Sequence, residues 1–362
     1  MKRTIRLFFG VILLATASLS AQTTVKMSAV KGNNYGVAYT LPKTSITITA
    51  TILKTTRTAG EYYQYAERYL NISNPIRQDE TIYELTNITS SSKGIPDKGN
   101  SFLVEFRSNS TSPFITLTKD GVICAINSDA VFEPKTAEAT ELENSAPDVL
   151  PNPRTFLSEE ILSAGSTAKQ AELIAKQIYK LRESKNNILT GEADNMPPDG
   201  NAYKIVMDQL TQQEKALTQM FIGQETAETS SVAFTVVPSD KNIDKQVLFR
   251  FSKHLGVVPA DDLSGAPVYL SLTNKTPIVK PILTPKEEKA LAEKFSKGII
   301  YNIPGKANLR ISFDSKEFVK KEIDVVQYGQ QDVLAEKMFD NNKQPVKVIF
   351  FPDLGAIKQI IQ

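Results

Sequence analysis

The sequence offers few side chains for nucleophilic or metal-dependent chemistry. Cys124 is its single cysteine and His254 its single histidine. A lone cysteine cannot close an intramolecular disulfide, and zinc sites need several Cys or His ligands at short spacing. Cys124 lies in an apolar run, GVICAIN, which favours a buried thiol over a nucleophile. His254 lies near the end of a predicted strand, where we expect a surface or hydrogen-bonded imidazole rather than a general base.

The motifs of several catalytic and cofactor sites are also missing from the sequence. It has no G-x-S-x-G elbow, no Gly-rich loop between a strand and a helix, and no D-x-D-x-D-G calcium loop. Ser166 begins an S-x-x-K match without the accompanying motifs, and we interpret it as a helix N-cap. We therefore expect no cofactor, no zinc or recognisable calcium site and no assignable catalytic residue. Glycoside hydrolysis by two carboxylates stays open, because the two acids need no proximity in sequence.

The residues that most suggest a ligand or partner surface are Tyr62, Tyr65 and Tyr69. They belong to the segment EYYQYAERYL, residues 61–70, which we predict to be one helix. On a helix the spacing i, i+3, i+7 places the three rings on one face. That face could stack on a sugar or on a partner protein. Alternatively, the rings pack on a neighbouring sheet while their hydroxyls reach water, as aromatic stripes commonly do.

The first 21 residues have the order of features that is typical of a signal peptide. Lys2, Arg3 and Arg6 precede an apolar run, 7–17, that is too short to span a bilayer, and small residues follow it. We expect cleavage between Ala21 and Gln22, with a second possible site after residue 17. Because no cysteine follows the apolar run, we do not expect a lipoprotein. The mature chain is therefore expected in the periplasm or at the cell surface.

The charge of the mature chain argues against binding to nucleic acid. Loss of the three basic residues of the leader changes the formal net charge from +2 to −1. A nearly neutral chain has no field to attract it to nucleic acid or to an anionic membrane surface. No later segment has 18 consecutive apolar residues, so we expect no transmembrane anchor in the mature chain.

The periodicity of the chain predicts an α+β fold, in which β-rich N- and C-terminal regions flank a central antiparallel helical hairpin. Strand-like alternation dominates the two ends, and helical periodicity dominates 166–189 and 201–221. Thr284, Pro285 and Glu287 form a capping box before a further helix. The predicted units are 1–21 (signal peptide), 22–132 (β-rich, with the Tyr-rich helix), 133–155 (acidic Pro-containing linker), 156–224 (helical hairpin) and 225–362 (β-rich, with one capped helix).

One passage of the sequence resembles another. The segments GVAYTLPKTSITI (36–48) and GIIYNIPGKANLRI (298–311) align Tyr39 with Tyr301 and Pro42 with Pro304. The likeness could mark two related β units or two similar strand–turn–strand passages, and the sequence leaves both open.

Several segments together resemble a domain-of-unknown-function family of exported Bacteroidota proteins. The segments that carry the resemblance span the mature chain and are GVAYTLPKT (36–44), YYQYAERYL (62–70), LTKDGVICAIN (117–127), 181–223, GIIYNIPGKA (298–307), VQYG (326–329) and the final FFPDLGAI (350–357). The resemblance implies export and a single architecture, and it supplies no catalytic residue.

Two functions remain compatible with these features. The first is a non-catalytic envelope protein that binds a partner or takes part in assembly through an exposed apolar or Tyr-rich surface. The second is a glycan-binding protein or a carboxylate-dependent glycoside hydrolase, which requires two acids and aromatic rings in one cleft. We expect the first, because the sequence is poor in catalytic motifs.

Overall fold

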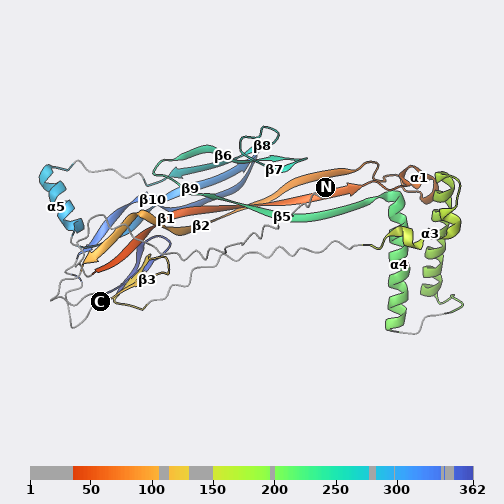
Figure 1. Cartoon of the computed structure of the whole chain (residues 1–362), viewed down its shortest axis with the longest axis horizontal. Helices are drawn as coiled ribbons and strands as arrows, with labels where there is room; N and C mark the ends of the chain where they lie inside the picture. The colour runs from red at the N-terminus through yellow and green to blue at the C-terminus, as the bar shows by residue number, and fades with distance from the viewer. Residues whose placement is uncertain are drawn as a thin grey trace, which may run out of the picture.

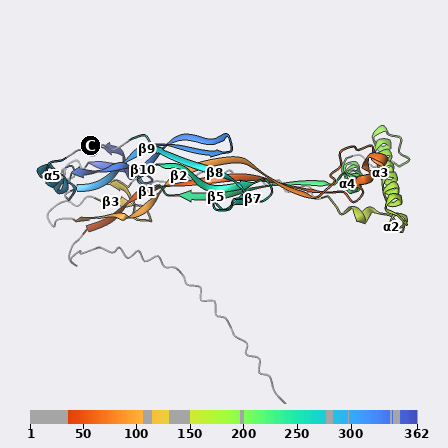
Figure 2. The same cartoon turned by 90° about the horizontal axis from the view of Figure 1, so that it is seen from above.

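The protein is an elongated α+β molecule with sheets along most of its length and a group of helices at one end (Figures 1 and 2). The computed structural model describes residues 36–105, 114–129, 150–195, 200–276, 283–296, 298–335, 338 and 346–361. The predicted signal peptide and residues 133–149 of the predicted linker lie outside the described residues.

The described strands form three antiparallel sheets. The three-stranded sheet has the order β2 (Glu80–Glu105), β1 (Gly36–Thr58), β5 (Gln224–Val236). The five-stranded sheet has the order β10 (Lys316–Ala335), β9 (Gly298–Phe313), β8 (Ala266–Asn274), β6 (Ile243–Ser252), β7 (Gly256–Val258). The four-stranded sheet has the order β12 (Ala356–Ile361), β11 (Lys347–Phe351), β4 (Ile123–Ile126), β3 (Ile115–Leu117).

The described helices are unevenly distributed along the molecule. Most of them gather at one end, which we call the helical end: η1 (Tyr63–Tyr65), α1 (Ala66–Leu70), η2 (Pro153–Phe156), α2 (Glu159–Leu162), α3 (Thr167–Thr190) and α4 (Asn201–Ile222). α5 (Pro285–Ser296) lies at the opposite end (Figure 1). Its predicted capping box is confirmed, because the side chains of Thr284 and Glu287 bond each other's backbone N–H groups. α3 and α4 are central in the sequence but stand at one end of the molecule.

Several strands are longer than the alternation predicted, because prolines and bulges interrupt the pattern without ending the strand. The alternating segments 36–40 and 46–53 belong to one strand, β1, with a register shift between Thr40 and Pro42. Pro42 has no N–H to donate, and β5 pairs with β1 only from Ile46 onward, so that no β5 carbonyl needs a donor at Pro42. Pro304 lies in the same way inside β9, beside a register shift against β10.

These bulges let one strand contribute to two hydrophobic cores. Before its bulge β1 buries Tyr39 and Leu41, at odd positions, against the four-stranded sheet and the ends of β9 and β10. After the bulge it buries even positions, from Ile46 to Ile52, against the five-stranded sheet. Since side chains alternate with a period of two, the extra residue of a bulge changes whether odd or even positions point to a given face.

A buried polar junction joins the bulged strands where the two cores meet. Asn302, which is 3% exposed, donates from its side-chain amide to the carbonyl oxygens of Pro42 (3.1 Å) and Leu354 (3.0 Å). Gln327 bonds both the N–H and the C=O of buried Thr44 through its side-chain amide, at 3.0 and 2.8 Å. Buried polar groups must find such partners, because an unpaired one costs free energy.

Four of the segments that carry the family resemblance meet at this junction: 36–44, 298–307, 326–329 and 350–357. Their backbones approach closely, and a Cβ atom at Gly329 would overlap the carbonyl oxygen of Ile303. The residue types in these motifs are therefore explained by folding.

Candidate functional site

The helical end has a hydrophobic core of its own, and Tyr62 belongs to it. The Tyr62 ring is 4% exposed and lies 5.8 Å from the ring of Phe221 on α4, centroid to centroid. Its hydroxyl donates to Gln170 Oε1 at 3.3 Å. Burial, with Glu61 nearby, raises the pKa of Tyr62. This ring therefore packs inside the helical end.

Tyr65 and Tyr69 are half-buried at the edge of this core. Their rings stack with centroids 6.0 Å apart, and the Arg68 guanidinium lies 5.3 Å from the centroid of the Tyr69 ring. The predicted single helix 61–70 is instead a 3₁₀ turn followed by the short α1, which ends at Asn71 in the left-handed conformation. All three tyrosines contact the core of the helical end, with Tyr62 inside it and Tyr65 and Tyr69 at its edge.

α3 and α4 pack along each other next to these rings (Figure 1). Ser166 caps α3, as predicted, by accepting from the Lys169 N–H at 3.2 Å. Farther along, Glu214 of α4 pairs with both Arg182 and Lys185 of α3. Burial raises the pKa of Glu214, but the two cations outweigh it and hold that pKa below its ordinary value.

Large apolar side chains remain exposed on the helices. Leu189 near the end of α3 is 64% exposed, Ile205 near the start of α4 is 60% exposed, and Leu162 at the end of α2 is 59% exposed. Tyr179 is 48% exposed, although its hydroxyl donates to the Tyr69 carbonyl oxygen. These four side chains form what we call the apolar set of the helical end.

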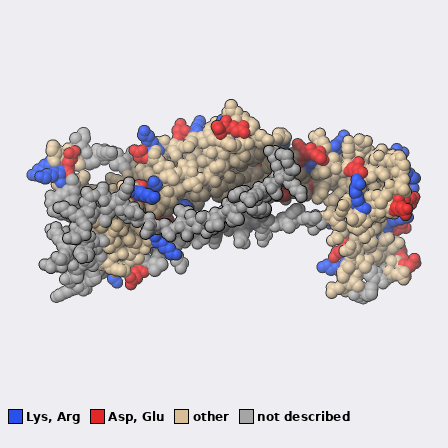
Figure 3. All heavy atoms as spheres, in the orientation of Figure 1, with Lys and Arg blue, Asp and Glu red and all other residues tan. Residues whose placement is uncertain are grey.

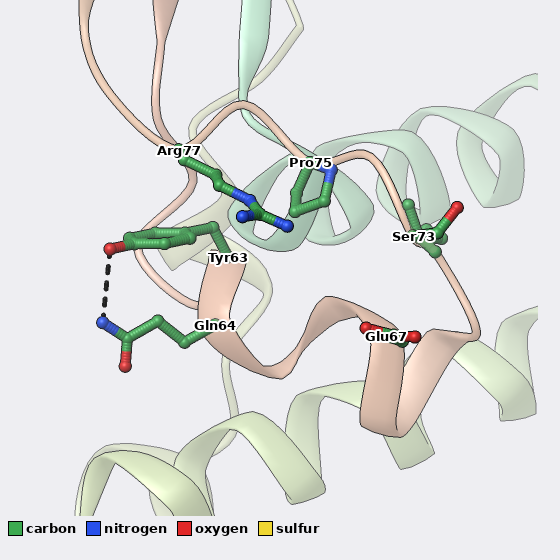
Figure 4. Close-up of a pocket in the computed structure, with 7 residues that line it drawn as sticks. Tyr63, Gln64, Glu67, Ser73, Pro75 and Arg77 are labelled. Carbon is green, nitrogen blue, oxygen red and sulfur yellow. Dashed lines mark hydrogen bonds between the residues drawn. The ribbon is translucent and has the colours of Figure 1, made fainter.

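Two cavities lie where the helical end joins the three-stranded sheet. The first has a volume of about 220 Å³ and is lined by Tyr63, Gln64, Glu67, Ile72, Ser73, Pro75 and Arg77 (Figure 4). The second, of about 390 Å³, is lined by Arg57, Asn74, Pro75, Ile76, Arg77, Gln78, Glu80 and Glu225. Pro75 and Arg77 line both, so that the cavities are neighbours on the segment between α1 and β2.

Backbone contacts fix the segment that carries these cavities. The Ile76 N–H donates to the Ile222 carbonyl oxygen at 2.9 Å, and Asp79 accepts from the Ala59 N–H at 2.8 Å. Gly223 follows α4 with a φ of +83°, and a Cβ there would lie 2.9 Å from the Ile76 Cβ. Glycine is therefore required where this segment crosses the end of α4.

The two arginines at the cavities differ in their partners. Arg57 pairs with Glu225 at 2.6 Å. Arg77 makes no ion pair and donates no side-chain hydrogen bond within the described part of the chain, and its side chain reaches across the first cavity between Tyr63 and Pro75 (Figure 4). Nothing in the sequence marks Arg77, because it lies in an irregular segment without a motif.

The remaining chemical candidates of the sequence lie apart from these cavities. Cys124 is buried in β4, and burial raises the pKa of its thiol. The His254 backbone N–H donates to Ser252 Oγ, in the turn after β6. Among the residues that the structure describes, no group of three or more His, Cys, Asp or Glu side chains is placed to hold a metal ion.

The described carboxyl groups whose pKa values are shifted all lie beside a cation or an N–H group. Within the described ranges, each carboxyl whose pKa is shifted has it lowered by a neighbouring cation or N–H group; examples are Glu172, beside Lys176 and Lys169, and Glu322, beside Lys275 and Lys306. A general acid of a glycosidase needs a raised pKa, the opposite shift.

On the face drawn in Figure 3, Lys and Arg lie among Asp and Glu rather than in a patch of one sign.

The fold and the site define an elongated α+β protein with a helical end that exposes apolar side chains beside two polar cavities. The chain belongs to the family described as Domain of unknown function (DUF4831), whose family model matches residues 35–358. No curated protein and no solved structure gives a significant match to the sequence. None of the described helices is both long enough and apolar enough to cross a membrane.

Proposed function

We propose that this is an exported, non-catalytic protein of the bacterial cell envelope that binds another protein through its helical end. The observation that carries the proposal is the apolar set: Leu162, Tyr179, Leu189 and Ile205, between 48% and 64% exposed, lie on the helices that project from the sheets. Exposed apolar side chains in one region of a protein favour an interaction surface.

The architecture supports a contact at a distance from the sheets. The strands β1, β2 and β5 run to the helices from the region of the five- and four-stranded sheets, which we call the sheet body. β1 and β5 pair along 13 consecutive positions of β1, from Ile46 to Thr58. A continuous antiparallel ladder is a stiff connection, so it holds the helical end in place. Within the helical end we propose that α3 and α4 form an antiparallel hairpin, as the pairing of Glu214 with Arg182 and Lys185 suggests.

Export and a Bacteroidota origin belong to the same proposal. The order of basic, apolar and small residues before Gln22 supports a cleaved leader. Binding of a glycan would use a different surface from binding of a protein partner, because the apolar set lies on the helices and the polar cavities lie beside them.

The test is covalent crosslinking in cells that express the protein naturally, followed by mass spectrometry of the captured proteins. A double variant, Leu189→Ser with Ile205→Ser, removes two exposed apolar side chains without touching a buried one. Leu263→Ser is the matched control, since Leu263 is 81% exposed on the sheet body. The proposal predicts one reproducible partner that the control keeps and the double variant loses. Equal capture by both variants would contradict it.

A further inference from the structure

We propose that the two cavities that share Arg77 bind a saccharide that carries a carboxylate, such as a uronic acid unit. This site is distinct from the apolar set and does not depend on the proposed protein partner. The proposal stands on the Arg77 guanidinium, which has no partner among the described residues, on the polar lining around it and on the rigidity of the segment that holds it.

Arg77 supplies the recognition of the carboxylate. Its guanidinium lines both cavities and has no ion pair or side-chain hydrogen bond in the described ranges, whereas neighbouring Arg57 is occupied by Glu225. The five N–H donors of a guanidinium form a planar fork that matches the two oxygens of a carboxylate. A charged donor with this geometry, unused by the protein itself, is available to a ligand.

The rest of the lining fits the hydroxyl groups and the ring of a sugar. Gln64 donates to the Tyr63 hydroxyl oxygen at 3.2 Å, which leaves the Tyr63 proton free to be donated onward. Ser73 in the first cavity and Asn74 in the second add further uncharged donors and acceptors. The ring of Tyr63 and the side chain of Pro75 provide apolar surface for the C–H groups of a sugar ring.

The acids at the cavities limit the negative charge that a ligand can carry. Glu67 lines the first cavity and Glu80 the second, and neither carboxylate has an ion pair in the part of the chain that the structure describes. Each can accept a hydrogen bond from a sugar hydroxyl. Each also repels negative charge on the ligand, so a phosphate ester, which carries more charge than a carboxylate, is disfavoured more strongly.

The site is formed without a ligand. Two hydrogen bonds hold the segment between α1 and β2: the Ile76 N–H donates to the Ile222 carbonyl oxygen, and Asp79 accepts from the Ala59 N–H just after β1. A ligand therefore does not have to order the loop, and less of the binding free energy is lost to conformational entropy.

The experiment is a titration of the chain from Gln22 onward with glucuronate, followed by NMR chemical shifts or calorimetry. Glucose, acetate and glucose 6-phosphate serve as competing probes. Arg77→Gln tests the guanidinium, and Arg310→Gln, an exposed arginine on β9, is the matched control. Far-UV circular dichroism confirms that both variants keep the fold.

The proposal predicts that glucuronate binds wild type and Arg310→Gln alike and binds Arg77→Gln at least about tenfold more weakly, the loss expected for one charge-assisted pair. Glucose and acetate alone should bind more weakly than glucuronate, and so should the phosphate ester. The proposal is overturned if glucuronate does not bind the wild type or if Arg77→Gln binds it with unchanged affinity. It is also overturned if any of the three other probes binds as tightly as glucuronate.

Discussion

Replacing Asn302 by alanine should destabilise the protein more than any surface change, because this side chain holds the buried junction together. The substitution leaves the Pro42 and Leu354 carbonyl oxygens, now bonded at 3.1 and 3.0 Å, without their donor. An orphaned buried acceptor costs about 1–3 kcal/mol. Pro42 is fully buried and Leu354 is partly accessible to water, so the second carbonyl costs less than the first. We expect a total loss of about 2–4 kcal/mol in the free energy of unfolding.

The assay is urea unfolding followed by far-UV circular dichroism, since the sequence contains no tryptophan. Asn308→Ala is the matched control, because Asn308 lies on the same strand and its side chain makes no hydrogen bond within the described ranges. The control should stay within about 0.5 kcal/mol of wild type. If Asn302→Ala lost less than about 1 kcal/mol, the junction would not be the stabilising contact that its geometry implies.

Three further substitutions test other parts of the structure by their unfolding free energies. Glu214→Gln should cost about 1 kcal/mol near neutral pH. The lowered pKa of Glu214 stabilises the wild-type fold fully above the ordinary pKa of 4.5, and this contribution is lost in stronger acid. The variant should therefore lose less stability than wild type between pH 6 and pH 3, and parallel acid profiles would refute this. Gly329→Ala should cost about 1–3 kcal/mol, because the new Cβ overlaps a carbonyl oxygen of β9. Gly99→Ala should be nearly neutral, because its Cβ would meet only Asp97 Oδ1 at an ordinary contact distance of 3.6 Å; equal effects would contradict the close approach at Gly329. Ser166→Ala should cost about 1 kcal/mol as a lost N-cap, against little for Ser158→Ala, whose side chain makes no capping bond; a neutral Ser166→Ala would disprove the cap.

Local signals in the sequence predicted the elements that depend on local physics. The capping box at Thr284 and the N-cap Ser166 were recognisable because a cap needs only a few neighbouring residues. The Asp-Gly pair at 120–121 is a local signal of the same kind, typical of a hairpin turn, and the structure has that hairpin between β3 and β4, with Gly121 at a φ of +78°.

The length of the strands could not be predicted from alternation alone. Pro42 and Pro304 interrupt the pattern, and only the paired strands show that each is a bulge inside one strand. The likeness between 36–48 and 298–311 has a structural counterpart, since both are strands that change cores at a proline. That change is a property of tertiary packing, which no local pattern encodes.

The candidate surface was predicted less well than the fold. The spacing of Tyr62, Tyr65 and Tyr69 left open a ligand surface or packing in a core, and the structure buries Tyr62 against α4 while Tyr65 and Tyr69 stay half-buried. The cavities around Arg77 had no signal, because their lining comes from an irregular segment together with the end of β1 and the start of β5. Such a site becomes visible only when residues distant in sequence are brought together.

The most direct test of the central claim, that the helical end contacts a partner, is site-specific photocrosslinking in cells that express the protein naturally. A photoreactive amino acid is placed at Tyr179 or Leu189 on the helical end, or at Leu263 on the sheet body, all of which are exposed. The account predicts that the two helical positions capture the same protein and that Leu263 does not. Capture at Leu263 alone, or at none of the three positions, would contradict it.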